Sequence, residues 1–108
     1  MRAVSIDVGD NGAMTVVLRG EVDFTQASPV AIAIREAIDE HRPRDVRIDL
    51  AEVTFLDSSG LGVLVHAMKA AEQIDARFLV RRPTPQVYDQ LELAGLLEVF
   101  GVSRKPGD

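Results

Sequence analysis

Strand-like and helix-like spacings of apolar residues alternate along this chain, and this alternation restricts its fold more than any other feature. Val46, Ile48 and Leu50 are apolar at every second position, as in a half-buried strand. Around residues 30–38 and 61–71 the apolar residues recur at every third or fourth position, as on one face of a helix. Chains with this alternation build parallel strands joined by right-handed crossovers. The sequence therefore predicts an α/β fold, in which helices pack against a mixed, largely parallel sheet of about four to five strands.

Turn and cap residues give the boundaries of the first predicted elements. Strand-like segments over residues 4–8 and 14–18 flank the turn Gly9-Asp10-Asn11-Gly12, so a hairpin opens the chain. Ser28-Pro29 has the residue types of a helix N-cap and the first helical position, and Pro43 ends the helix that this pair begins.

The later elements follow the same rules. A connector leads from the third strand to Asp57, and a second helix comes after it. The apolar stripe of that helix consists of Leu61, Leu64, Val65, Met68 and Ala71. Residues 78–80 form the next predicted strand, Thr84-Pro85 begins a third helix, and Gly95 caps its end. Residues 97–102 are a candidate last strand.

Composition excludes several classes of function. The 108 residues, of which 46% are apolar, suit one domain over residues 1–108 with a single core. A net charge of −5 without any Lys/Arg-rich run argues against direct DNA binding and against attachment to an anionic membrane. Residues 1–7 hold no secretory apolar core, and the apolar run 61–67 is too short to span a membrane, so we expect a cytoplasmic protein without membrane insertion. The absence of cysteine excludes disulfides and thiolate chemistry.

The segment Leu56-Asp57-Ser58-Ser59-Gly60-Leu61-Gly62 says most about function. It places two hydroxyls beside a carboxylate where an extended run gives way to a helical pattern. A helix start offers unpaired N–H groups and a partial positive charge, so the fold would partly tolerate a phosphorylated serine there while the surface changed sharply in charge. Asp57, Ser58 and Ser59 are also residue types that cap helices, and capping is the alternative role.

Two segments together resemble those of STAS domains. Gly20-Glu21-Val22-Asp23 follows the second predicted strand, and Asp57-Ser58-Ser59-Gly60-Leu61-Gly62 precedes the second predicted helix at the interval usual for that family. The resemblance covers residues 4–102 and leaves 103–108 as a polar tail. More narrowly, the chain looks like a bacterial anti-sigma factor antagonist, a free-standing STAS protein that sequesters an anti-sigma kinase and so liberates a sigma factor.

The resemblance implies roles for both segments. In that family the hydroxyl residue directly after the aspartate is phosphorylated by the partner kinase, and that position is Ser58 here, with Asp23 matching an aspartate that lies near it. The resemblance thus implies an anti-sigma factor serine kinase and a phosphoserine phosphatase as partners, no enzymatic activity and no cofactor, and binding that phosphorylation switches off. Ser59 is a second candidate acceptor. The partner-binding loop predicted in this way contains Asp23, Asp57, Ser58, Ser59, Gly60 and Gly62.

Ligand-binding alternatives find less support in the sequence. Gly60 and Gly62 hint at a dinucleotide fingerprint, but its third glycine would fall at Val65. Glu21 and Asp23 have no histidine or carboxylate cluster at metal-ligand spacing, so we expect no metal site.

Catalytic alternatives also lack parts. A serine hydrolase built on Asp57-Ser58 would need a Gly-x-Ser-x-Gly elbow, which is absent, and neither His41 nor His66 is placed as its base. A phosphoaspartate receiver would use Asp57 and the pair Lys105-Pro106, but the acidic pair after its first strand is missing. The main alternative within the STAS family is a soluble subunit of a transporter or lipid-transport complex that binds an ABC-type ATPase, since fold alone does not decide function.

Overall fold

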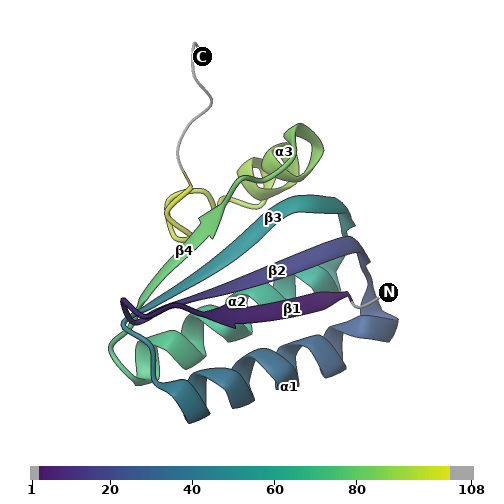
Figure 1. Ribbon diagram of the computed structural model, residues 1–108. Helices are drawn as coiled ribbons and strands as arrows, with labels where there is room; N and C mark the ends of the chain where they lie inside the picture. Colours follow the sequence, from purple (N-terminus) through teal and green to yellow (C-terminus); the bar gives the residue numbers. More distant parts are fainter. Residues whose placement is uncertain (1–2, 103–108) are drawn as a thin grey trace.

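The computed structural model describes residues 3–102 and shows, over that range, the α/β architecture that the sequence predicts (Figure 1). The strands are β1 (Val4–Val8), β2 (Ala13–Val22), β3 (Asp45–Leu56) and β4 (Arg77–Arg81). The helices are α1 (Phe24–His41), α2 (Ser58–Gln73) and α3 (Pro85–Leu93). The polar tail predicted over 103–108, with the pair Lys105-Pro106, lies outside the described residues.

The strands form one mixed sheet in the order β1-β2-β3-β4. β1 and β2 make the antiparallel hairpin that the turn predicts, while β2, β3 and β4 run parallel. α1 joins β2 to β3 and α2 joins β3 to β4, and these two helices lie side by side against one face of the sheet (Figure 1). α3 packs against β3 instead, where the side-chain amide of Gln90 donates to the carbonyl oxygen of Leu56 at 2.6 Å.

The core lies between the sheet and the two crossover helices. It takes the inward positions of β2 and β3, among them Val16 and Ile48, and the apolar stripes of α1 and α2. Leu64 is fully buried, as the predicted stripe of the second helix requires, and Met68 is partly buried at the margin of the core. The apolar periodicity therefore located the buried face of α2 only approximately. Leu61 and Val65 of the predicted stripe are also only partly buried, whereas three residues outside the stripe are buried, namely Val63, Ala67 and Ala70.

α1 begins earlier than the sequence predicts. Its first residue is Phe24 and its N-cap is Asp23, so the predicted start at Ser28-Pro29 is wrong and Pro29 lies inside the helix. The side chain of Asp23 accepts hydrogen bonds from both the backbone N–H and the hydroxyl of Thr25, which satisfies a donor that the helix start leaves open. A good cap at Asp23 and burial of Val30 and the residues beyond it outweigh the missing N–H of Pro29.

β2 and β3 are both longer than their alternating patterns indicate. β3 continues to Leu56, so the connector predicted before Asp57 does not exist. The pairing of β2 with β3 contains register shifts between Val17 and Arg19 and between Gly20 and Glu21. Such bulges break the period of two that identifies a strand in a sequence, which explains why the pattern ended too soon.

Residues 97–102 are not a strand, which corrects the prediction of a candidate last strand. They form turns closed by local hydrogen bonds, for example from the N–H of Phe100 to the carbonyl oxygen of Leu96 at 3.0 Å. Gly101 has a φ of 66°, which an extended strand does not accommodate, and the ring of Phe100 is fully buried beside Phe78. The start of α3 at the N-cap Thr84 and the left-handed Gly95 after its end are as predicted.

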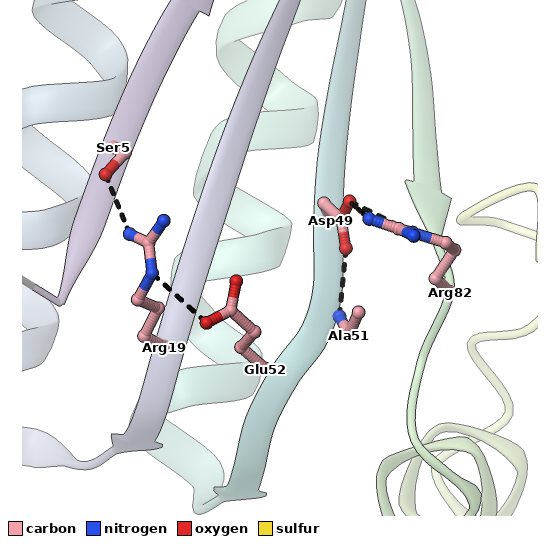
Figure 2. A network of polar contacts seen from close by, with 6 residues as sticks. All are labelled: Ser5, Arg19, Asp49, Ala51, Glu52 and Arg82. Atoms are coloured by element: carbon pink, nitrogen blue, oxygen red, sulfur yellow. Dashed lines mark hydrogen bonds and ion pairs between the residues drawn. The ribbon is translucent and has the colours of Figure 1, made fainter.

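Paired charges occupy the face of the sheet turned away from α1 and α2 (Figure 2). Arg19 donates to the hydroxyl of Ser5 and pairs with Glu52, and Arg82 donates two hydrogen bonds to Asp49. Burial raises the pKa of Asp49. The hydrogen bonds from Arg82 and from the N–H of Ala51, together with the positive charge of Arg82, lower this pKa by more than burial raises it, so the net shift is downward. Asp45 pairs in the same way with Arg47 and Arg77. Ion pairing allows both carboxylates of β3, Asp45 and Asp49, to be only 8% exposed.

Across residues 3–102, no helix combines the length and the apolar character that a membrane crossing needs.

Candidate functional site

Two aspartates stand at the carboxyl ends of neighbouring parallel strands. Val22 and Leu56 are partners in the register of β2 and β3, and each is followed directly by an aspartate, Asp23 and Asp57. Both aspartates are N-caps, of α1 and α2 respectively. Since neighbouring strands lie about 5 Å apart, the two carboxylates share one edge of the sheet, as the family resemblance implies.

Hydrogen bonds hold each carboxylate against its own helix. Asp23 accepts from the Thr25 N–H at 3.0 Å and from the Thr25 hydroxyl at 2.6 Å, and this hydroxyl lowers the pKa of Asp23. Asp57 accepts from the N–H of Gly60 at 2.9 Å. Asp57 is therefore the N-cap of α2, and the neighbouring residues Ser58 and Ser59 do not cap this helix.

Ser58 is the first residue of α2 and is exposed. Within residues 3–102, no group forms a hydrogen bond with its hydroxyl. The N-terminal end of a helix stabilises negative charge, so the position offers an accessible hydroxyl in an environment that tolerates a phosphate. Accessibility of this hydroxyl is what modification by an enzyme requires.

The residues after Ser58 belong to the first turns of α2 rather than to a loop. Ser59 and Gly62 are half-buried, and Gly60 is buried. A Cβ on Gly60 would stand 2.5 Å from the carbonyl oxygen of Val22 and 3.0 Å from the Cδ2 of Leu56, so its role here is close packing of α2 onto the end of β2. A Cβ on Gly62 would meet nothing within 4 Å.

Two exposed aromatic rings, which the sequence reasoning missed, lie next to the carboxylates. Phe24 follows Asp23 and is 74% exposed, while Phe55 is 40% exposed and pairs with Glu21 in the sheet register. The signal was an aromatic residue placed at the start of a helix, outside its apolar stripe. Exposed aromatics beside polar groups are typical anchors of protein interfaces.

The carboxyl ends of β2 and β3 and the first residues of α1 and α2 share one edge of the sheet, which we call the carboxyl-edge surface. Its members are Glu21, Asp23, Phe24, Phe55, Asp57 and Ser58. Of the sequence-predicted site residues, the structure brings Asp23, Asp57 and Ser58 together here, and it places Gly60 beneath them.

The described part of the chain offers little for metal or acid–base chemistry at this surface. Over residues 3–102, no three His, Asp or Glu side chains gather in a way that could hold a metal ion. His41 is the last residue of α1, and His66 is an exposed residue of α2. Neither imidazole forms a hydrogen bond with Ser58 in the described part of the chain.

Comparison with known proteins points to one family. The family model described as the STAS domain matches residues 6–108. The anti-sigma-B factor antagonist of Listeria monocytogenes is 27% identical over 109 residues, covering 98% of this chain and 92% of the relative. The anti-sigma F factor antagonist of Paenibacillus polymyxa is 30% identical over 91 residues, covering 84% of this chain and 78% of the relative.

Solved structures agree with this fold. An anti-sigma factor antagonist from Mycobacterium paratuberculosis matches with a TM-score of 0.78 and 25% identity, over 95% of this chain and 86% of that one. SpoIIAA in its unphosphorylated form matches with a TM-score of 0.77 and 21% identity, over 94% of this chain and 100% of that one. The phosphorylated form of Bacillus SpoIIAA matches with a TM-score of 0.70 and 22% identity, over 87% of this chain and 85% of that one. The SpoIIAA likenesses concern the fold alone.

Proposed function

The chain belongs to the STAS family, and we propose that it is an anti-sigma factor antagonist, a protein that binds an anti-sigma factor and so releases a sigma factor. Relatives that span nearly the whole chain carry that function in their names. The partner in this proposal is an anti-sigma factor with serine kinase activity, and a phosphoserine phosphatase reverses its action. The protein itself acts by binding and catalyses nothing.

The exposed hydroxyl of Ser58 is the observation that carries this proposal. It lies at the start of α2, next to Asp57 and on the same edge of the sheet as Asp23. Among the described residues its hydroxyl is not hydrogen-bonded, so a kinase can reach it without breaking a structural contact. Phe24, directly after Asp23, is an exposed aromatic residue that can add apolar contact area.

Phosphorylation of Ser58 would change the charge of this surface without unfolding the protein. A phosphate adds about −1.5 to −2 charge at neutral pH. At an effective dielectric of about 20, two like unit charges about 4 Å apart repel by about 4 kcal/mol. A free-energy difference of about 4 kcal/mol separates a nanomolar from a micromolar complex. One phosphate that faces a negative group of the bound partner therefore suffices to release a partner that fits the unmodified surface.

The test is affinity capture with two forms of the purified protein, unmodified and carrying phosphoserine incorporated at position 58. Mass spectrometry identifies the captured proteins. We expect the unmodified form to retain an anti-sigma factor and the phosphoserine form to release it. Equal retention of that factor by both forms would contradict the switch, and capture of an ABC-type ATPase in its place would favour a role in a transporter complex.

A further inference from the structure

A groove runs between α1 and α2 and leads away from the carboxyl-edge surface. It encloses about 540 Å³. Its floor is apolar, with small residues such as Ala31 and Ala70, and Ile32 at its side is 46% exposed. The groove is thus wide and apolar enough to receive side chains of another protein segment.

The ionisable side chains that line the groove are all basic. Arg35 comes from α1, and His66 and Lys69 come from α2. No Asp or Glu lines the groove, although the chain as a whole has a net charge of −5. Over the described range, Arg35 and Lys69 take part in no ion pair, unlike the arginines on the sheet face. The groove is an unneutralised cationic site in an acidic protein.

The helical repeat connects the groove with Ser58. Residues four apart share one face of a helix, so Ser58, Gly62 and His66 form a single stripe along α2, and the groove is lined by the last two of them. On α1, Phe24 and Ser28 stand in the same relation, and Ser28 lines the groove. Both walls of the groove therefore lead at their N-terminal ends to the carboxyl-edge surface.

We propose that this groove binds an acidic, amphipathic helical segment of the anti-sigma factor. The apolar side of the segment packs on the floor, and its carboxylates pair with Arg35 and Lys69. From Ser59 to Gln73 the wall formed by α2 is about 20 Å long, which matches about four turns of a helix. This inference rests on the proposed function, because it assigns the partner's docking segment. The same inference explains how a phosphate on Ser58 releases the partner, because a dianion at this end of the groove repels an acidic segment bound there.

A defined probe tests the groove without knowledge of the partner. The probe is a fluorescein-labelled, 15-residue synthetic peptide with Leu and Ala on one helical face and Glu on the other, and the same peptide with Lys in place of Glu is its control. Fluorescence anisotropy measures its affinity, and amide chemical shifts of the labelled protein locate it. We expect the Glu peptide to bind and to shift the amides of Ala31, Gly62 and Ala70, and the Lys peptide to bind at least tenfold more weakly.

Matched variants separate the groove from general electrostatics. The double variant Arg35→Gln/Lys69→Gln removes two cations from the groove, and Arg42→Gln/Arg44→Gln removes two exposed cations near the other end of α1, outside it. We expect the first pair to weaken binding of the Glu peptide at least tenfold and the second pair to change it less than twofold. Equal effects of the two pairs, or shifts confined to other residues, would overturn the inference.

The same variants and the anti-sigma factor distinguish the two proposals. If the groove variants bind the anti-sigma factor as tightly as the wild type while phosphoserine at position 58 still releases it, the groove inference fails and the proposed function stands. If no anti-sigma factor binds the unmodified protein, the proposed function fails, whatever the peptide does.

Discussion

The carbonyl oxygen of Val22 lies so close to Gly60 that a Cβ on residue 60 would stand 2.5 Å from it. This contact seats the first turn of α2 against the end of β2, and it thereby brings Asp57 and Ser58 beside Asp23. A residue that the family resemblance marks as part of a motif thus has a packing role that can be measured separately from binding.

Replacement of Gly60 by alanine should destabilise the protein. The added methyl group would meet the Val22 carbonyl oxygen and the Leu56 side chain, so we expect a loss of about 1–3 kcal/mol in the free energy of unfolding. Gly62→Ala is the matched control, because its methyl group meets nothing within 4 Å and alanine favours a helix interior by about 1 kcal/mol. Urea denaturation measures both, and similar effects of the two substitutions would refute the packing role of Gly60.

Capping by Asp57 can be separated from its charge. Asp57→Ala removes the acceptor for the Gly60 N–H, and we expect it to lower the free energy of unfolding by about 1 kcal/mol. Asp57→Asn keeps an acceptor oxygen without the charge and should recover most of that loss. Urea denaturation at neutral pH gives the comparison. An asparagine variant as unstable as the alanine variant would show that charge, rather than the cap, provides the stability.

Negative charge at position 58 should weaken binding of the anti-sigma factor. We expect Ser58→Ala to stay bound in the presence of kinase and ATP, and Ser58→Glu to bind at least tenfold more weakly by isothermal titration. Asn11→Asp makes the same change in net charge at an exposed position in the turn before β2, at the opposite end of that strand from Asp23, and should bind like the wild type. Because glutamate imitates a phosphate imperfectly, phosphoserine at position 58 gives the decisive measurement.

Phe24 should contribute to binding and little to folding. Its ring is 74% exposed, so we expect Phe24→Ala to change the free energy of unfolding by less than about 0.5 kcal/mol. If Phe24 is an aromatic anchor of the interface, Phe24→Ala should weaken binding of the anti-sigma factor at least tenfold. Leu93→Ala, at an 89% exposed residue of α3, is the control for both measurements. Loss of affinity in the Leu93 variant alone would move the interface to α3.

The sheet face should contribute acid-sensitive stability through Asp49. Its pKa is lowered in the folded protein, chiefly because Arg82 outweighs the effect of burial. A lowered folded pKa stabilises the fold above the unfolded value of about 3.9, and this contribution is lost as the pH falls through the folded pKa. Arg82→Gln should raise the Asp49 pKa in a carboxyl NMR titration and reduce stability at pH 7 more than at pH 2. An unchanged Asp49 pKa in this variant would exclude the pairing as its cause.

Local patterns in the sequence predicted the α/β class, the opening hairpin, the order of helices and strands up to α3, and the start of a helix at the two serines. These features are encoded locally, in the spacing of apolar residues and in cap and turn residues such as Asp57 and Thr84. At Ser28-Pro29 a local signal was misleading because Asp23 provides an earlier cap.

Tertiary contacts set the length of β3, the turns over residues 97–102, the exposure of Phe24 and the groove beside Arg35. Bulges between β2 and β3 interrupt the alternation that a sequence displays, so neighbouring strands rather than local pattern set the end of β3. Exposure and grooves depend on which faces of α1 and α2 meet the sheet and each other. Those contacts join residues far apart along the chain, and no local spacing records them.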